Sequence, residues 1–418
     1  MTGTPGALDH RGRPRVVVTG MGVKTPAGLT VDALWDGLLA ARSAAAPVTL
    51  FDASAHSVDF ACEVAGFDPV DYVGPKEVRR TDRTSLLGIA AADDAIAQAT
   101  ESGPFGVDPV RCGVVAGSGI GGIRTLEDQV VGYAEKGPGK VGPFLVPMMM
   151  ANATAALVGI RHKFTGPNTA VSTACATGAH AIGDGVRLVR DGMADVVVAG
   201  GTEACITPVT MAAFARMGAL SRNDDPARAS RPFDDDRDGF VMGEGAAFVV
   251  LESYEAAVAR GAALLGEVAG YGMTCDAHHI TAPIEDGSGA VAAIEMALAD
   301  AGLDPSVIGH VNAHGTSTPH NDSAEAAAIA KVFGAGALPV TSIKGVTGHL
   351  IGAAGAVEAV ATLRSVDRGL VPPTANHRHT TLPVDVVAGE PRTIERTPAV
   401  STSFAFGGHN VALVLAPV

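Results

Sequence analysis

The segment Val171-Ser172-Thr173-Ala174-Cys175-Ala176-Thr177-Gly178 joins a β-branched run to a run of small residues. This change predicts a strand over 170–173 that stops abruptly and a helix that begins near Cys175. Because N–H groups at a helix N-terminus lack partners and the macrodipole is positive there, a cysteine in this place favours the thiolate. Cys175 is therefore a candidate nucleophile. The alternative is a small buried hydrophobic side chain, as most free cysteines are.

Short valine-rich runs alternate with alanine-rich stretches along the whole chain, which predicts a layered α/β fold. The runs are almost entirely apolar, so we expect helices on both faces of the sheet. In the helix after Cys175, Ala179, Ile182, Val186 and Val189 form one inward-facing stripe. The expected strands cover residues 15–20, 112–117, 170–173, 195–200, 246–251, 310–313 and 339–343.

Composition narrows the class of protein. The chain has 418 residues, of which 52 are glycine, 47% hydrophobic and 4% aromatic, and this suits a large core with many tight strand–helix turns. A formal charge of −14 argues against general binding to nucleic acid or anionic membranes. No apolar run approaches the roughly 18 to 20 residues that span a bilayer, and no apolar segment follows a basic start. We therefore expect a cytoplasmic protein.

We expect a flexible N-terminal tail over 1–14 and one compact unit over 15–418, because no Pro- or Ser-rich linker divides the chain. Periodicity fades at 51–82 and 274–289, which predicts irregular excursions over the sheet edges. The 5 cysteines are odd in number and contain no C-x-x-C pair, so neither a disulfide framework nor a zinc site is expected. The histidines at 278–279 and 377–379 lack helical spacing with a carboxylate, which favours solvated loops over a metal site.

Three further polar residues follow expected strands. His314 comes after the run at 310–313, and Lys344 and His349 come after the run at 339–343. Because ligands gather beyond the carboxyl ends of strands in covered α/β sheets, these residues and Cys175 are expected to converge. Taken singly, each histidine could be a hydrogen-bonded structural residue, and Lys344 could pair with Glu358 in a buried ion pair.

At this point the chain resembles the elongating β-ketoacyl-[acyl carrier protein] synthases of the thiolase-like superfamily, over almost its whole length. The motifs that carry the resemblance are Arg15-Val16-Val17-Val18-Thr19-Gly20-Met21-Gly22, Thr173-Ala174-Cys175, Ala199-Gly200-Gly201-Thr202-Glu203, Arg231-Pro232-Phe233-Asp234 and Ser403-Phe404-Ala405-Phe406-Gly407-Gly408-His409-Asn410. The resemblance implies a duplicated βαβαβαββ fold in five α/β layers, with halves at approximately 15–265 and 266–418, and usually a dimer.

The same resemblance implies roles for the strand-end residues. Cys175 would be the acylated nucleophile, and His314 and His349 would act on a malonyl thioester, with Lys344 supporting the site electrostatically. Decarboxylation creates an enolate that two imidazole N–H groups can stabilise. Because departing carbon dioxide drives the condensation, neither a metal nor a redox cofactor is expected.

Residues around the reacting groups also match family positions. The backbone N–H groups of Cys175 and Phe406 would form the oxyanion hole, and Thr316 and Thr318 would hydrogen-bond the phosphopantetheine arm of the acyl carrier protein. The alternative for the two threonines is plain loop capping. The remaining matches are Ile120 and Phe214 in the acyl pocket, Phe406 as its gate, and Glu358 as structural support.

Acyl carrier proteins are acidic, so an enzyme of charge −14 needs a basic landing patch. The cluster Lys76, Arg79 and Arg80 fits this need, with Lys140 and Arg216 as additions, although a solvated charge run would look the same. The chain departs from the family pattern at Ala405, where glycine is usual, and at His278, where tyrosine is common. A methyl group at 405 restricts the backbone and would stiffen the gate.

Four hypotheses about the function of this chain follow from these residues. Fatty acid elongation by a homodimer is the main one. The run Pro319-His320-Asn321-Asp322 suits equally a ketosynthase of a type II polyketide synthase that pairs with a chain-length-factor partner. A non-catalytic length-determining subunit is disfavoured by Cys175. A coenzyme A thiolase needs a second, C-terminal cysteine as base, and none follows Cys275, which itself precedes no helix or small-residue turn.

Overall fold

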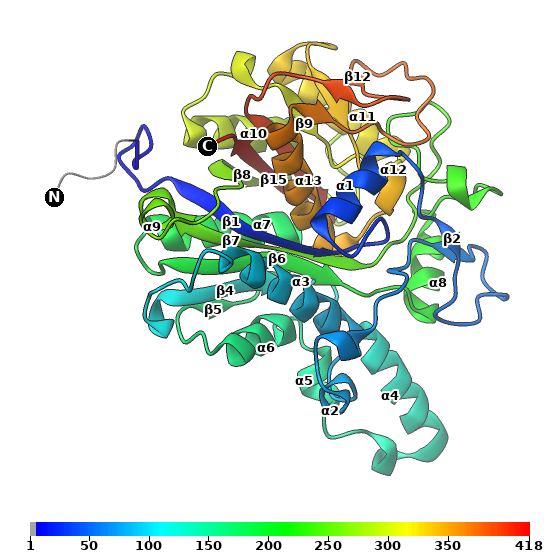
Figure 1. Cartoon of the computed structure of the whole chain (residues 1–418). Helices are drawn as coiled ribbons and strands as arrows, with labels where there is room; N and C mark the ends of the chain where they lie inside the picture. The colour runs from blue at the N-terminus through cyan, green and yellow to red at the C-terminus, as the bar shows by residue number, and fades with distance from the viewer. Residues whose placement is uncertain (1–5) are drawn as a thin grey trace.

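A computed structural model describes residues 6–418 and shows one mixed sheet of 11 strands in the order β12-β10-β9-β14-β15-β8-β1-β7-β6-β4-β5 (Figure 1). The strands of this sheet are β1 (Val16–Lys24), β4 (Cys112–Gly117), β5 (Asn168–Thr169), β6 (Val196–Glu203), β7 (Gly245–Ser253), β8 (Gly266–Cys275), β9 (His310–Asn312), β10 (Pro339–Thr341), β12 (Asp385–Val386), β14 (Ala399–Ala405) and β15 (His409–Ala416).

The sheet repeats one topology twice. The order β5-β4-β6-β7-β1 in the first half has the same sequence of connections as β10-β9-β14-β15-β8 in the second. In both halves the first three strands pair in parallel and the last two joins are antiparallel. The halves meet where Val17 and Val18 of β1 pair with Glu267 and Gly266 of β8. This repeat confirms the duplicated fold that the resemblance implies.

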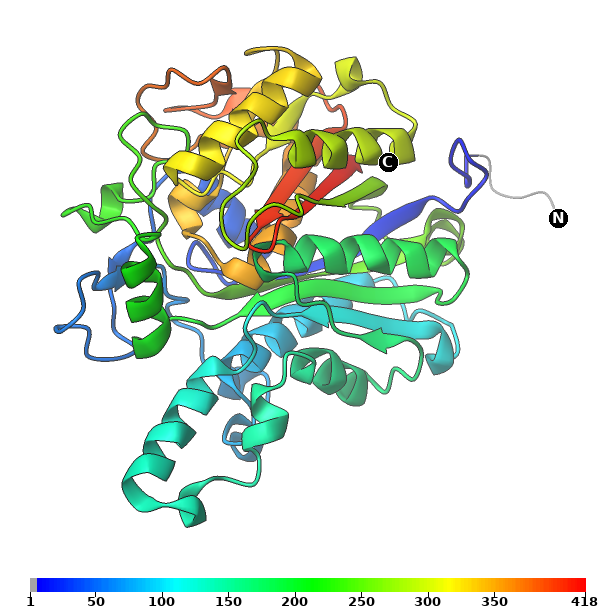
Figure 2. The ribbon, with the colours of Figure 1, turned by 180° about the vertical axis from the view of Figure 1, so that it is seen from behind.

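Helices complete five layers (Figures 1 and 2). Helix α3 packs on β1 and β7, and α10 packs on β8 and β15, so each covers an outer face. Helices α7 and α13 pack against each other between the two halves of the sheet, where Ile182 and Val357 belong to one buried cluster. The bounds are α3 (Arg83–Ala99), α6 (Ala153–His162), α7 (Thr177–Arg190), α10 (Ser288–Ala301), α11 (Pro319–Phe333) and α13 (Ala354–Arg368).

Glycines allow the outer helices to approach the sheet, and they do so in both halves. A Cβ on Gly22 of β1 would lie 2.0 Å from the carbonyl oxygen of Ala91 in α3. A Cβ on Gly272 of β8 would lie 2.1 Å from the carbonyl oxygen of Ala293 in α10. No side chain fits at such distances, so this helix–sheet packing requires glycine at both positions.

The other helices and strands cover the sheet ends. Figures 1 and 2 show α4 and α5 projecting from one end of the molecule, next to α2. The helices are α1 (Val31–Leu39), α2 (Pro75–Val78), α4 (Ile123–Lys136), α5 (Leu145–Met149), α8 (Pro208–Met217), α9 (Tyr254–Ala259) and α12 (Lys344–Thr347), and the strands are β2 (Ala46–Pro47), β3 (Phe60–Ala61), β11 (Leu370–Val371) and β13 (Arg392–Thr393). Within residues 6–418, no helix combines the length and apolar character needed to cross a membrane.

The start of the chain differs in part from the expected loose tail. Residues 1–5 lie outside the described range, but residues 6–14 are fastened to the body of the protein. The guanidinium of Arg13 bridges Asp9 at 2.7 Å and Asp300 of α10 at 2.8 Å. Asp300 also pairs with Arg190 of α7 at 2.8 Å, so one carboxylate joins the N-terminal segment to two helices.

Candidate active site

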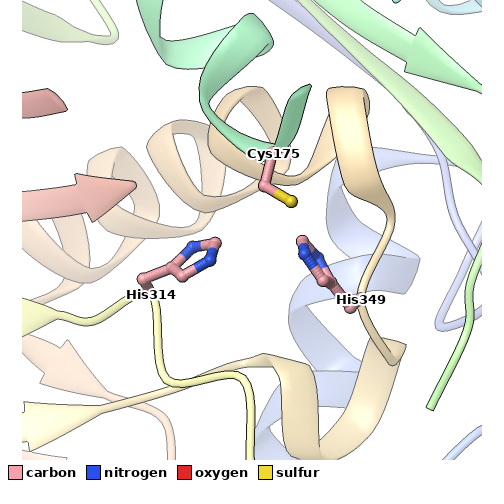
Figure 3. A group of neighbouring side chains, drawn as sticks. All are labelled: Cys175, His314 and His349. Atoms are coloured by element: carbon pink, nitrogen blue, oxygen red, sulfur yellow. The ribbon is translucent and has the colours of Figure 1, made fainter. Parts of the chain in front are cut away.

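Cys175, His314 and His349 come from three separate connections and meet at one place (Figure 3). Cys175 lies in the 3₁₀ turn Ala174–Ala176, His314 follows β9, and His349 follows α12. The cysteine sulfur and one ring nitrogen of each histidine all lie within 4.8 Å of one another. The two imidazole rings stand nearly perpendicular, at 86°, with centroids 5.3 Å apart. The structure therefore brings together three of the four residues that were expected to converge, and the fourth, Lys344, contacts His314 from behind.

The expected strand over 170–173 is wrong, because β5 ends at Thr169. After it, the carbonyl oxygen of Val171 passes so close to β4 that a Cβ on Gly117 would lie 1.9 Å away. The segment therefore crosses the end of the sheet instead of extending it. Ala174 then adopts a φ of 48°, a left-handed conformation that turns the chain sharply into Cys175 and α7.

The Cys175 thiol is protonated at rest, which corrects the expected thiolate. The side chain is 8% exposed, and burial raises the pKa of Cys175 to about 12. The Lys344 ammonium and the backbone N–H of Phe406 lower this pKa, and the Glu203 carboxylate raises it. Desolvation outweighs the favourable position near the start of α7, so the thiol needs a base when it reacts.

Both active-site histidines are neutral. Burial and the nearby Lys344 ammonium hold the pKa of His314 and of His349 well below the usual value. The Nζ of Lys344 lies 3.2 Å from Nδ1 of His314 and donates to the His314 carbonyl oxygen at 2.5 Å. Because an ammonium can only donate, Nδ1 of His314 accepts, and this assigns the ring proton to Nε2.

Lys344 lies behind His314 instead of lining the cavity. It is 1% exposed and forms an ion pair with Glu358 of α13, which is equally buried. The structural alternative considered for this lysine is therefore true as well: it pairs with Glu358 and contacts His314 at once. A cysteine and two histidines are also ligands that zinc accepts, and of the groups within residues 6–418 this is the set that could hold a metal ion. The ammonium beside His314 disfavours a cation there.

These residues open into a cavity of about 520 Å³. The residues that line the cavity include Ile120, Phe214, Thr316, Thr318 and Phe406. The hydroxyls of Thr316 and Thr318 lie 2.9 Å apart. The loop predicted at 274–289 contributes Thr281, Ala282 and Pro283 to the lining.

A chain of aromatic rings runs along the wall of the cavity. The ring centroid of Phe406 lies 6.5 Å from that of Phe214, which lies 5.5 Å from Phe240, which in turn lies 5.3 Å from the His349 ring. Phe240 was not predicted from the sequence, because it follows an irregular segment with no pattern to mark it. Phe404 also lines the cavity and was missed for a different reason: it faces inward from a strand that was not predicted.

Ala405 and His278, the two departures from the family pattern, lie in different surroundings. Ala405 is the last residue of β14 and pairs with His409 across the β14–β15 hairpin, in a backbone conformation that any residue adopts. Its methyl group therefore causes no backbone strain in this structure. His278 is exposed in the loop after β8 and does not line the cavity.

None of the predicted docking residues lines the cavity. Lys76, Arg79 and Arg80 are exposed on and after α2, and the guanidinium of Arg80 lies 4.8 Å from the Phe144 ring. Lys140 and Arg216 are exposed too, on the turn after α4 and on α8. Cys275 is exposed, with its sulfur 3.7 Å from the carbonyl oxygen of Gly407, and it does not face the two histidines.

Two buried carboxylates near the site escaped sequence analysis as functional residues. Glu325 of α11 accepts the backbone N–H of His314 at 2.8 Å and of Gly315 at 2.7 Å, which fixes the loop that carries His314. Glu203, at the end of β6, accepts the Ser118 hydroxyl at 2.6 Å. Burial raises the pKa of each carboxyl to about 7. For Glu325 the only sequence signal was a charged residue within an alanine-rich run, whereas Glu203 ends one of the motifs that carry the resemblance.

Comparison with known proteins agrees with this geometry. The model of the β-ketoacyl synthase N-terminal domain matches residues 13–257, and that of the C-terminal domain matches residues 265–378. The 3-oxoacyl-[acyl-carrier-protein] synthase 2 of Synechocystis is 48% identical over 96% of this chain and 97% of its own, and the Vibrio cholerae protein of the same name is 47% identical over 96% and 98%.

Solved structures give the same result. A β-ketoacyl synthase from Burkholderia phymatum superimposes with a TM-score of 0.89 at 36% identity, covering 97% of this chain and 99% of that one. The structure described as the ishigamide ketosynthase/chain length factor has a TM-score of 0.90 at 35% identity and covers 97% and 100%. With both domain models matched in order and relatives aligned over nearly their full lengths, the chain belongs to the β-ketoacyl synthase family.

Proposed function

We propose that this protein condenses an acyl chain held on Cys175 with malonyl-[acyl carrier protein], releasing carbon dioxide and lengthening the chain by two carbons. The observation that carries this proposal is the meeting of a buried thiol with two neutral imidazoles in one cavity. A cysteine thioester keeps its carbonyl reactive while the second substrate binds, which suits the making of a carbon–carbon bond.

In the first step, the Cys175 sulfur attacks the thioester carbonyl of the acyl donor. A sulfur–carbon bond forms, the bond to the carrier's thiol breaks, and that thiol leaves with a proton. Because Cys175 is a neutral thiol, a neutral imidazole within 4.8 Å is suited to accept its proton during the attack. The N–H groups of Cys175 and Phe406 would stabilise the oxyanion, and the influence of the Phe406 N–H on the Cys175 sulfur supports this role.

In the second step, the bond between the malonyl carboxylate and its α-carbon breaks, carbon dioxide leaves, and the electron pair forms an enolate. The Nε2–H of His314, fixed by the Lys344 contact at Nδ1, would donate to the enolate oxygen beside His349. The α-carbon then attacks the Cys175 thioester, and the sulfur leaves and regains a proton. The proposed chemistry uses neither a metal nor a redox cofactor, because decarboxylation supplies the carbanion.

The cavity walls suit a long apolar substrate. The acyl chain would lie against Ile120 and Phe214, behind Phe406, and the phosphopantetheine arm would pass the hydroxyls of Thr316 and Thr318. The exposed basic residues Lys76, Arg79 and Arg80 would receive the acidic carrier protein. One solved relative, 29% identical with a TM-score of 0.89, is described as a type II polyketide synthase acyl-carrier protein in complex with its ketosynthase.

Fatty acid elongation is the pathway we propose, on the strength of the relatives named 3-oxoacyl-[acyl-carrier-protein] synthase 2. A polyketide ketosynthase with a chain-length-factor partner is the second candidate, favoured by Asn321 in the cavity lining and by solved complexes of that kind. One assay distinguishes these two candidate pathways. Purified protein that elongates saturated acyl chains alone acts in fatty acid synthesis, whereas activity only after addition of a partner subunit indicates the second pathway.

We propose a homodimer for the elongation enzyme. Strand β5 lies at the edge of the sheet, with Asn168 and Thr169 exposed, and unpaired edges pair readily with another copy. On the neighbouring helices Val130, Val146 and Ile160 are 55%, 59% and 74% exposed. Light scattering on the purified protein should give twice the mass of one chain, and a monomer at micromolar concentration would contradict the proposal.

The transfer of an acyl group to Cys175 provides the test of the proposed reaction. Intact-protein mass spectrometry with an acyl donor should show one added acyl group on the wild type and on Cys275→Ala, and none on Cys175→Ala. His314→Ala and His349→Ala should still become acylated but condense with malonyl substrate roughly 10² to 10⁴ times more slowly. Full acylation of Cys175→Ala would refute the nucleophile, and parental elongation by either histidine variant would refute its role.

A further inference from the structure

Glu203 is a fully buried carboxylate beside the active site that the proposed reaction does not use. It is the last residue of β6 and is 0% exposed. Its Oε1 accepts the Ser118 hydroxyl at 2.6 Å, and its Oε2 accepts the backbone N–H of Gly119 at 2.8 Å and of Gly352 at 3.1 Å. All three partners are neutral donors, so the carboxylate joins two loops instead of balancing a cation.

The two backbone donors reach Glu203 only because they are glycines. A Cβ on Gly352 would lie 2.7 Å from Oε2 of Glu203 and 2.5 Å from the nitrogen of Gly119. A Cβ on Gly119 would lie 2.9 Å from the same oxygen. All three distances are shorter than any normal contact, so the loops are packed around the carboxylate with no room for a side chain.

The loops that Glu203 joins are two walls of the acyl cavity. Gly119, Ile120 and Ile351 all line the cavity together with Cys175, and a Cβ on Gly119 would lie 3.1 Å from Cγ2 of Ile351, so the two loops meet beside the cysteine. Ser118, held by Glu203, accepts the backbone N–H of Gly121 at 2.7 Å and of Ile120 at 3.4 Å, so the carboxylate orders this wall through the serine. On the other wall, Ile351 has a φ of 46°, a strained conformation for a β-branched residue, next to the Gly352 N–H that Glu203 accepts.

We propose that Glu203 is a positioning residue that holds Ile120 and Ile351 in place beside Cys175 and thereby sets which acyl chain lengths the cysteine accepts. The inference rests on the acyl-transfer function proposed above and adds to it a residue that determines chain-length selectivity without touching the substrate. A carboxylate is required because three donors converge on two oxygens. Glutamine offers one acceptor oxygen and an NH₂ group that would face at least one of these donors.

The test measures initial rates of Cys175 acylation, by intact mass, with acyl-carrier-protein donors of graded chain length. Glu203→Gln should change the ratio of the rates for the longest and shortest accepted chains by roughly ten-fold, as expected for losing a charged hydrogen bond in the wall. Ser118→Ala, which removes only the hydroxyl between Glu203 and Ile120, should shift the ratio in the same direction. If Glu203→Gln does not fold, Ser118→Ala tests the proposal on its own.

The control is Glu252→Gln. Glu252 of β7 is also buried, at 2% exposure, and it accepts the Thr19 hydroxyl at 2.5 Å, although it also pairs with Arg260; its backbone lies opposite Val196, at the other end of β6 from Glu203. In Glu252→Gln, the ratio of the acylation rates for the longest and shortest accepted chains should equal that of the wild type. A uniform fall in rate for all chains, with the ratio unchanged in both Glu203→Gln and Ser118→Ala, would overturn the inference. A wild type that takes up no acyl group would instead refute the proposed function.

Discussion

At the scale of single residues, the protonation state of Cys175 controls its chemistry. Burial raises the pKa of Cys175 to about 12, so the thiolate fraction should grow about ten-fold with each pH unit through the neutral range. We therefore expect the rate of Cys175 alkylation by iodoacetamide to rise roughly 100-fold from pH 7 to pH 9 without a plateau. Peptide mapping of the time course gives this rate for Cys175 alone, and a plateau below pH 8 would mean a resting thiolate.

The place of Cys175 could be predicted from the sequence, but its protonation state could not. The change from a β-branched run to small residues marks a sharp turn into a helix, and such turns are local features. The pKa depends on the distant residues that bury the sulfur, among them Ile206 and Met211, which share its apolar cluster. For the same reason His314 and His349 could be identified as candidates, while the Lys344 contact that fixes the His314 tautomer needed the fold.

At the scale of elements, the Lys344–Glu358 pair links α12 to α13 beneath the His314 loop. Lys344→Met leaves the Glu358 carboxylate buried without its cation, so the free energy of unfolding should fall by about 3 to 5 kcal/mol. Adding Glu358→Gln removes that charge and should restore most of the stability. Condensation should stay roughly 10²-fold slower in both variants, because neither can hold His314 through its Nδ1.

Urea unfolding and the condensation assay separate these two effects. The matched control is Lys24→Met, which removes another lysine of 1% exposure, paired with Asp94 of helix α3. It should lower stability and leave the specific condensation rate of the folded protein unchanged. If the double variant at 344 and 358 recovers both stability and condensation, Lys344 serves the fold alone.

Strands β1, β4, β6 and β7 were predicted because each holds an apolar run of three or more residues, although glycines also stand within β1, β4 and β6. Strand β4 was predicted with its observed bounds, and β6 and β7 within a few residues. Strand β8 was missed because Gly270 and Gly272 interrupt its pattern, and these glycines exist to let α10 approach. Strand β14 mixes small, polar and apolar residues, so only the resemblance pointed to its region. Strand β15 was missed although residues 411–416 form an apolar run of the kind that predicts a buried strand.

At the scale of the whole molecule, the duplicated sheet explains why the site could be assembled from distant segments. His314 follows β9 and Lys344 follows β10 in the second half, while Cys175 follows β5 in the first. In the two halves β4–β5 and β9–β10 occupy equivalent places in the same strand order, so their carboxyl ends carry equivalent loops. The packing of α7 against α13 between the halves then brings those loops to one cavity.

The same burial makes the folded protein sensitive to acid. His180 and His310 have their pKa lowered to about 4 by burial, so each stays neutral in the folded state and takes up a proton on unfolding between pH 4 and 6.5. The contribution of these two histidines to the free energy of unfolding is therefore fully present above pH 6.5 and is lost as the pH falls toward 4. Glu203 and Glu325, with pKa raised to about 7, act in the opposite direction, since their contribution is lost as pH rises through 7.

His310 allows this acid sensitivity to be tested at one position, because both of its ring nitrogens are buried without a hydrogen-bond partner among the described residues. His310→Leu removes a group whose pKa falls from 6.5 to about 4 on folding. Relative to the wild type, the variant should therefore gain about 2 kcal/mol more stability at pH 5 than at pH 7.5. Urea unfolding at the two pH values measures this difference, with the exposed His278→Leu as the control that should show none. An equal gain at both pH values would mean that folding does not lower the pKa of His310, and the acid sensitivity would then have to come from the remaining buried histidines.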